Sequence, residues 1–332
     1  MRVQNKIKKA RAKLLGLEHI PNSLDRRITA IESRLGNIED EIRFVRSKVE
    51  IEVQTLPISK DEVLTKIFTD LKMYLNPSDM AVAAHIALDG IWEENITRAW
   101  LAVLARDNVV LDIGANFGYY SLLAGQFTDK KKARIVAFEA NEDIVPYIQK
   151  SASINWLNEQ ITVENLAVAD VEKELVLNVL ENYTGSSSLQ TIQQLDSYMH
   201  DKMRLKLSDS KKVKSVTIDN YCKRNHIEEV NLIKMDIEGY EEKAYRGMGE
   251  IIKNSKDVTL FIEFTKDGYE DPENFYNQML ADFGYVYLID DHGMLTKQTN
   301  NSYAAIIGDA DDWVMPVFSK NPQLDKVKNV AI

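Results

Sequence analysis

The stretch VVLDIGANFGYYSLLAG, residues 109–125, decides the fold of this chain. Residues 109–113 are apolar apart from Asp112, which is typical of a strand buried on both faces of a parallel sheet. The turn GANFG at residues 114–118 lets the backbone approach a ligand closely, and a helical run over residues 119–127 follows it. The order of strand, glycine turn and helix predicts the first unit of a ligand-binding α/β domain.

Strand-like and helical segments continue to alternate downstream. Strands are expected at residues 134–139, 161–168, 230–236, 258–264 and 303–308. Helices are expected at residues 142–157 and 241–252. This alternation predicts a doubly wound parallel sheet, whose ligands bind at the carboxyl ends of the strands.

Acidic side chains stand at the ends of three expected strands, namely Glu139, Asp236 and Glu263. A carboxylate is costly to bury without a partner, so we expect these three to share a polar cleft. Glu139 lies 21 residues after Gly118, a suitable place for an acid that binds two ribose hydroxyls. The cleft is therefore predicted to hold a ribose-containing cofactor.

The turn itself favours one cofactor over another. A dinucleotide-binding loop has glycine at positions where this chain has Asn116 and Tyr119 or Tyr120. These replacements disfavour contact with a pyrophosphate and therefore disfavour a dinucleotide cofactor. A nicotinamide-dependent oxidoreductase is thus the less favoured alternative. S-adenosylmethionine has ribose but no phosphate, and its cationic sulfur suits an acidic cleft.

Six segments together resemble the FkbM-type methyltransferases in order and spacing. They are VVLDIGANFGYYSLLAG (109–125), IVAFEAN (135–141), NLAVADVEKELVLNV (165–179), YTGSSSL (183–189), VTIDNYC (216–222) and VNLIKMDIEGYEEKAYRGM (230–248). Ala140 is a departure, because the family commonly has proline there. The resemblance implies a class I methyltransferase (Rossmann-like) fold and an S-adenosylmethionine-dependent O-methyltransferase, whose acceptor is typically a hydroxyl of a sugar, a polysaccharide or a natural product.

The resemblance also implies which residues bind the cofactor. Those implied for the methionine portion are Gly114, Asn116 and Gly118, with Asp112 supporting the loop or reaching the amine. Those implied for the ribose and the adenine are Glu139, Asn141 and the segment from Ala167 to Asp170. No metal is expected, because the chain has one cysteine and five histidines without close spacing.

The catalytic residues are expected at the end of the strand at residues 230–236. Asp236 and Glu238 alternate along the chain, so in an extended segment both face the same side, and either is a candidate general base. Lys234 and Glu263 are expected to support them. The alternative for Lys234 and Glu263 is a structural ion pair.

The N-terminal region has a different character. Residues 1–56 hold 12 basic and 8 acidic residues, although the whole chain has a net charge of −10, which argues against nucleic acid as the main partner. Residues 24–56 follow a heptad pattern with Ile, Leu or Val at nine of ten core positions, which predicts a homotrimeric coiled coil or, alternatively, one amphipathic helix packed on its own domain. Residues 1–17 form a basic amphipathic segment that either contacts a membrane surface or is a solvated terminus.

Three regions are therefore expected. Residues 1–56 form a basic oligomerisation stalk, residues 57–107 a helical lead-in with helices at 61–75 and 80–106, and residues 108–320 the catalytic domain. The protein is expected in the cytoplasm, at the inner face of a membrane if residues 1–17 bind one. A third functional alternative is a non-catalytic interaction protein that works through its coiled coil.

Overall fold

The computed structural model describes residues 55–105, 108–180, 182–189, 207–265, 269–308 and 313–327. The predicted membrane contact at residues 1–17 and almost all of the predicted coiled coil at residues 24–56 lie outside these ranges. In the described ranges, every helix is too short or too polar to cross a membrane.

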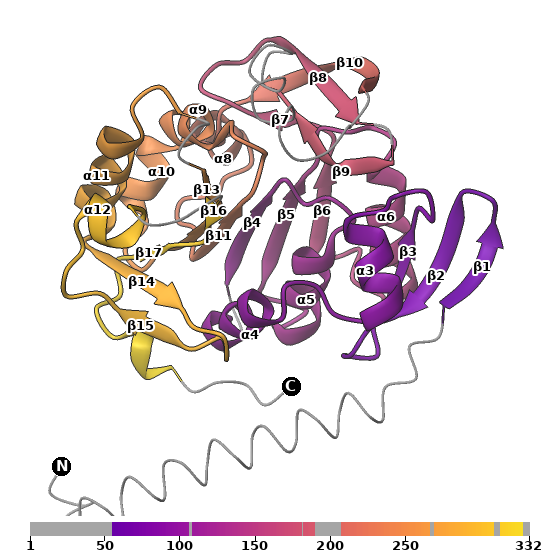
Figure 1. The fold of residues 1–332 in the computed structure, drawn as a ribbon, viewed down its shortest axis with the longest axis horizontal. Helices are drawn as coiled ribbons and strands as arrows, with labels where there is room; N and C mark the ends of the chain where they lie inside the picture. The colour runs from indigo at the N-terminus through magenta and orange to yellow at the C-terminus, as the bar shows by residue number, and fades with distance from the viewer. Residues whose placement is uncertain are drawn as a thin grey trace, which may run out of the picture. The chain divides into compact units, whose positions relative to one another are not determined.

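A mixed sheet of eight strands forms the centre of the domain (Figure 1), in the order β15-β14-β17-β12-β11-β4-β5-β6. Its five parallel strands are β4 (Val109–Ile113), β5 (Arg134–Phe138), β6 (Ile161–Glu164), β11 (Leu232–Met235) and β12 (Thr259–Ile262). The strands at the other edge are β14 (Tyr285–Ile289), β15 (Leu295–Lys297) and β17 (Val317–Ser319). Because β17 runs antiparallel to β12, the prediction of a doubly wound parallel sheet holds for the half that carries the glycine turn.

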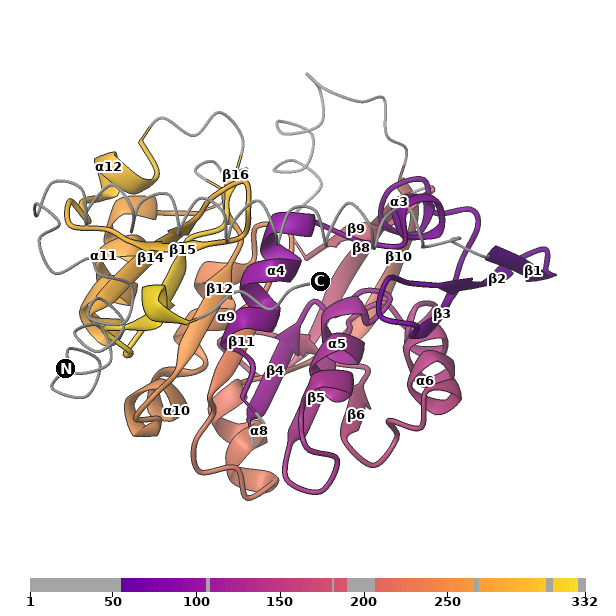
Figure 2. The same ribbon diagram turned by 90° about the horizontal axis from the view of Figure 1, so that it is seen from below.

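Helices cover both faces of this sheet. Alternate strand residues such as Leu111, Ile233 and Leu260 join one buried cluster with α8 (Ile218–Arg224), α9 (Glu241–Arg246), α10 (Gly249–Asn254) and α11 (Pro272–Phe283). On the other face, α4 (Glu94–Val103) and α5 (Tyr119–Phe127) lie side by side, next to α6 (Val145–Ile154) (Figure 2). Helix α5 covers β4 and β5, whereas α4 contacts β14 and, through Trp100, Phe261 of β12. The strand residues that alternate with Leu111, Ile233 and Leu260 therefore point to the face that α4 and α5 cover.

The lead-in differs from the prediction. The helix expected at residues 61–75 is wrong, because these residues and those just before them form an antiparallel sheet of β1 (Thr55–Ser59), β2 (Glu62–Lys66) and β3 (Lys72–Leu75). In β3, the buried Met73 and Leu75 alternate with Lys72 and Tyr74, which is the period of a strand. The strand docks on α6, where the backbone N–H of Tyr74 donates to Ser151 Oγ at 2.9 Å.

The structure also differs from the predicted ends of two neighbouring helices. The heptad pattern predicts helix to residue 56, whereas Thr55 and Leu56 belong to β1. The helix expected at residues 80–106 is two helices, α3 (Val82–Asp89) and α4, because Gly90 takes a left-handed conformation with φ +68° and ends α3.

Other expected strands are divided or replaced. Residues 161–168 split into β6 and β7 (Ala167–Val168), and β7 joins a second sheet with β8 (Glu174–Leu180), β9 (Tyr183–Ser188) and β10 (Leu207–Val216). Residues 258–264 divide into β12 and β13 (Phe264–Thr265), which pairs with β16 (Trp313–Val314). The strand expected at residues 303–308 is wrong, because Tyr303–Ile306 form the short helix α12 after a Ser302 turn.

Candidate active site

A cleft opens at the carboxyl ends of β4, β5 and β11. It encloses about 520 Å³ of space, part of which is open solvent. Six of the predicted site residues line it: Gly114, Asn116, Glu139, Ala167, Asp236 and Glu238. The second sheet supplies another wall through Leu177, Ser187 and Leu189. Of the three acids expected to share a cleft, Glu139 and Asp236 line it, whereas Glu263 is not among its lining residues.

The glycine turn is shaped by close backbone contacts. Gly114, Asn116 and Gly118 all have positive φ angles, of +80°, +50° and +83°. A Cβ on Gly114 would stand 1.9 Å from the carbonyl oxygen of Asp236, and one on Gly118 would stand 2.7 Å from Ile148 Cγ2. Gly114 therefore lets the turn meet the loop after β11, whereas Gly118 packs against α6 and does not line the cleft.

Glu139 is held rigidly at the end of β5. Its Oε2 accepts the backbone N–H of Asn116 at 2.8 Å, and its Oε1 accepts the backbone N–H of Asn141 at 2.7 Å. Burial raises the pKa of Glu139 to about 7 despite these hydrogen bonds. The carboxyl group is therefore oriented toward the cleft before any ligand binds.

Two amide side chains beside Glu139 have buried polar atoms without a hydrogen-bond partner among the described residues. These atoms are Oδ1 of Asn116 and Nδ2 of Asn141. Asn141 is fully buried and does not line the cleft, whereas Asn116 does. An unpaired buried polar atom is costly, so Asn116 Oδ1 is suited to meet a donor on a ligand.

The end of the third predicted strand forms an apolar wall. Leu166, Ala167 and Val168 line the cleft opposite Leu177 of β8, which makes a surface suited to a flat ring. Asp170 is exposed and is not among the residues that line the cleft. The predicted border from Ala167 to Asp170 is thus formed by its first part alone.

A buried ion pair closes the base of the cleft. Lys234 Nζ donates to Asp236 Oδ2 at 2.7 Å, and Lys234 is only 3% exposed. Burial alone would lower the pKa of Lys234, but Asp236, Glu93 and Asp112 outweigh burial and raise it above its ordinary value. Lys234 thus stays a cation and fixes one oxygen of Asp236, while the Asp236 residue itself lines the cleft.

Asp112 supports the turn from beneath. It sits directly opposite Lys234 in the parallel register of β4 and β11, so both side chains face α5. Its Oδ2 accepts the hydroxyl of Ser121 in α5 at 2.6 Å, and burial raises its pKa. Asp112 does not line the cleft, so of its two predicted roles the geometry favours supporting the loop.

The loop after β11 depends on an acid that the sequence analysis missed. Glu241 Oε1 accepts the backbone N–H groups of Ile237 at 2.8 Å and Gly239 at 3.3 Å, and its Oε2 accepts the hydroxyl of Tyr269 at 3.0 Å. The hydroxyl of Ser188 in β9 donates to the carbonyl oxygen of Glu238 at 2.9 Å. An acid in the first turn of a helix is the pattern that could have indicated Glu241.

Glu263 differs from the other carboxylates of the site. Burial, followed by the nearby Asp236, Glu238 and Glu241, raises the pKa of Glu263 well above its ordinary value. Its Oε2 has no hydrogen-bond partner among the described residues. The raised pKa favours the neutral form of Glu263, which suits a supporting residue better than a base.

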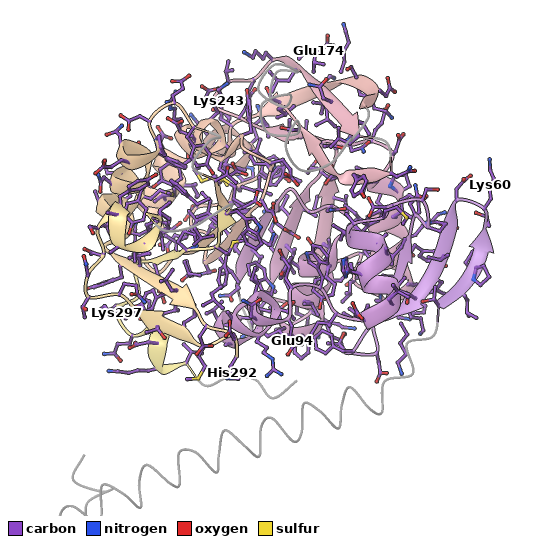
Figure 3. All side chains as sticks on the ribbon, in the orientation of Figure 1. Lys60, Glu94, Glu174, Lys243, His292 and Lys297 are labelled. Atoms are coloured by element: carbon purple, nitrogen blue, oxygen red, sulfur yellow. The ribbon has the colours of Figure 1, made fainter. Side chains whose placement is uncertain are left out.

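No group of three or more His, Cys, Asp or Glu in the described ranges is arranged to hold a metal ion. His292 in the β14–β15 turn lies at the edge of the domain (Figure 3), and its backbone N–H donates to Asp290 Oδ1 at 2.9 Å.

Comparisons with solved structures find the chain similar to several methyltransferases at low identity. One is a methyltransferase FkbM from Methylobacillus flagellatus KT, with 15% identity over 66% of this chain and a TM-score of 0.39; this chain spans 47% of its length. Another is TYW2 from P. horikoshii in complex with MeSAdo, with 10% identity over 87% of this chain and 86% of that chain and a TM-score of 0.40. A third is TYW2 from M. jannaschii in complex with AdoMet, with 13% identity over 80% of this chain and 87% of that chain and a TM-score of 0.37.

No curated protein matches the sequence. The model of the methyltransferase FkbM domain matches residues 112–287, from the glycine turn through both sheets to β14. This range includes every predicted site residue described above. The chain belongs to the FkbM methyltransferase domain family.

Proposed function

We propose that this protein is an S-adenosylmethionine-dependent O-methyltransferase that modifies a hydroxyl on a sugar or polysaccharide. The observation that carries the proposal is Glu139, whose carboxyl group is held by two backbone amides in a cleft that also contains Asp236 and Glu238. A fixed carboxylate can accept both hydroxyls of a ribose, and the acids across the cleft favour a cation.

The residues of the cleft fit this cofactor. Glu139 would hold the ribose, and Leu166, Ala167 and Val168 would cover the adenine. The buried and unpaired Oδ1 of Asn116 would accept a hydrogen bond from the amine of the methionine portion. A dinucleotide-binding loop has glycines at positions where this turn has larger residues, so the turn is poorly suited to contact a pyrophosphate. This argues against a nicotinamide cofactor.

Bound S-adenosylmethionine supplies an electrophilic methyl group, so the main tasks of the chain are to align the acceptor and remove its proton. Asp236 is the better placed base of the two candidates. Lys234 binds its Oδ2 at 2.7 Å, which leaves Oδ1 to take the hydroxyl proton. The backbone carbonyl of Glu238 accepts the hydroxyl of Ser188, and Glu238 has a left-handed φ of +55°. Glu238 would therefore shape the part of the loop that faces the acceptor.

The acceptor class rests on the family and on the wall formed by the second sheet. Ser187 of β9 and the nearby Leu189 line the cleft beside Glu238. A hydroxyl, an apolar side chain and a carboxylate together suit a sugar ring, which has polar edges and an apolar face. These same residues make β9 the element that would recognise the acceptor.

Two assays test the proposal. Calorimetry should detect binding of S-adenosylmethionine and not of NAD, and Glu139→Ala should abolish it. Transfer of a labelled methyl group should then occur to a glycan extract and to simple sugars, with the label stable to base as expected of a methyl ether. Binding of the cofactor without transfer to any hydroxyl acceptor would favour the non-catalytic alternative, and binding of NAD would favour an oxidoreductase.

We further propose that the chain is a homotrimer through residues 24–56, with residues 1–17 at an anionic membrane surface. The support is the heptad pattern and the basic N-terminal segment. Light scattering of the intact chain should give three times the monomer mass of 37.9 kDa. A monomer mass rules out the trimer, and failure to sediment with anionic vesicles rules out the membrane contact.

A further inference from the structure

Glu93 reaches the base of the cleft from outside the matched family domain. It precedes α4, whereas the family model begins at Asp112. Its side chain is partly buried, and desolvation, followed by the opposing effects of Lys234 and Asp236, raises its pKa. A segment outside the family domain thus contributes a charge to the ion pair that contacts the cleft.

A continuous chain of contacts joins Glu93 to Asp236. The hydroxyl of Tyr120 donates to Glu93 Oε2 at 2.8 Å. The ring of Tyr120 lies 4.7 Å from Lys234 Nζ, within the range of a cation–π interaction. Lys234 Nζ in turn donates to Asp236 Oδ2 at 2.7 Å. Each link is buried or partly buried, so solvent screens these interactions weakly.

The backbone holds Glu93 in this position at some cost. Glu93 has a left-handed conformation with φ +42°, which is uncommon for a residue with a side chain. The turn is clamped by Thr97, whose hydroxyl donates to the carbonyl oxygen of Trp92 at 2.6 Å and whose N–H donates to that of Glu93 at 2.8 Å. Trp100 anchors α4 through edge contacts with the rings of Tyr120 and Phe261.

We propose, on the basis of the function proposed above, that Glu93 is a positioning residue for methyl transfer. Through Tyr120 and Lys234, it sets the orientation and the charge balance of the Asp236 carboxylate. A negative charge at Glu93 competes with Asp236 for the field of Lys234. Lys234 therefore interacts with two carboxylates, and each of them competes with the other for its charge.

Several charged groups surround Asp236 and contribute to this balance. They are Lys234 of β11, Glu93 before α4, Asp112 of β4, Glu241 of α9, Glu263 after β12 and Glu238 in the same loop. Glu93 is distinguished from the other acids by its link to Lys234 through an aromatic ring. Its removal should therefore change the Lys234–Asp236 pair without changing the residues that line the cleft.

The test compares Glu93→Gln with Glu94→Gln in the full-length chain. Glu94 is the next residue, its side chain is 33% exposed, and it pairs with Arg98 at the edge of the domain (Figure 3). Glu93→Gln should lower kcat by about tenfold, with the KM for the cofactor changed by less than about twofold. The acid limb of the pH profile of kcat/KM should move to lower pH, because Asp236 then faces the whole charge of Lys234.

Two further variants separate positioning from simple structural support. Glu93→Asp keeps the charge and should return the acid limb toward that of the wild type. Tyr120→Phe keeps the ring and removes the hydroxyl donor, so its kcat should lie between those of the wild type and Glu93→Gln. The inference is overturned if Glu93→Gln matches Glu94→Gln in kcat and pH profile, or if Glu93→Gln and Glu93→Asp lose activity equally with an unmoved acid limb.

A measurement without turnover separates this inference from the proposed function. A double-mutant cycle of Glu93→Gln and Lys234→Gln in urea unfolding should show a coupling of at least about threefold in the unfolding equilibrium constant. Additive effects overturn the inference. If the wild type transfers no methyl group, the proposed function fails, while the cycle still decides whether Glu93 is coupled to Lys234.

Discussion

The carbonyl oxygen of Asp236 stands 1.9 Å from the point that a Cβ on Gly114 would occupy. The turn after β4 and the loop after β11 therefore meet without space for any side chain. We expect Gly114→Ala to push these two segments apart and to lower the free energy of unfolding by about 3 kcal/mol. Calorimetry with S-adenosylmethionine should also show loss of binding, because both segments line the cleft.

Gly284 provides the matched control. It has φ +85°, close to the +80° of Gly114, but a Cβ on it would have no neighbour within 4 Å. Gly284→Ala should therefore show the cost of the left-handed conformation alone, about 1 kcal/mol, with normal cofactor binding. Equal unfolding free energies for the two variants would show that the contact with Asp236 does not matter.

Glu139 makes cofactor binding depend on pH. Its pKa of about 7 in the free protein means that the carboxylate form, which can accept two hydroxyl donors, is lost as the pH falls below 7. The Kd should therefore rise about tenfold for each pH unit below 7 and stay constant above it. Calorimetry from pH 5.5 to 8.5 measures this dependence.

Variants of two nearby acids test whether Glu139 is the titrating group. Glu139→Gln should bind about 10- to 100-fold more weakly and without the pH dependence, because a hydrogen bond to a charged acceptor is lost. The exposed Glu142 lies three residues further on and pairs with Lys211. Glu142→Gln should leave both the affinity and its pH dependence unchanged. A persistent pH dependence in Glu139→Gln would mean that another group titrates.

Glu241 makes the stability of the fold depend on pH. Burial raises its pKa from 4.5 to about 7, so between these values the folded chain keeps a proton that the unfolded chain loses. The free energy of unfolding should therefore fall as the pH rises from 4.5 to 7, by at most roughly 3 kcal/mol from this residue. Urea unfolding at a series of pH values measures the slope.

The variant Glu241→Gln isolates this contribution. The amide oxygen of Gln can still accept the N–H groups of Ile237 and Gly239, but the side chain cannot ionise. The slope should become shallower. A remainder should come from the other acids with raised pKa values, which are Glu139, Asp112, Glu93 and Glu263. Glu229→Gln changes a half-exposed acid that pairs with Lys256, and it should keep the wild-type slope between pH 4.5 and 7. A wild-type slope in Glu241→Gln is the result that would contradict the assignment.

Asp236 and Glu238 differ in their expected effect on turnover. Asp236→Asn should lower kcat by about 10²- to 10⁴-fold with intact cofactor binding, because the proton acceptor is removed. Glu238→Gln should act mainly on the KM for the acceptor. Wild-type turnover in both variants would show that neither is the base, and a greater loss in Glu238→Gln would exchange their roles.

Much of the fold can be predicted from local sequence patterns. The strand at residues 109–113 and the helix at residues 119–127 appear as predicted, because a buried run, a glycine turn and a helical run are all local features. The strands β1 to β3 were not predictable in the same way. Their segments are short, and β3 is stabilised by docking on α6, some 70 residues further along the chain.

The sequence by itself determined the βα unit, the acids at the ends of β5, β11 and β12, and the family. Only the tertiary structure decided which of those acids share the cleft and which are covered. Glu139 and Asp236 line it, whereas Lys234 and Asp112 do not. Lys234 and Asp112 both face α5, because residues opposite each other in adjacent parallel strands point their side chains to the same face of the sheet. The proposed role of Glu93 depends on the contact between α4 and α5, because its partners Tyr120 and Lys234 are distant from it in sequence.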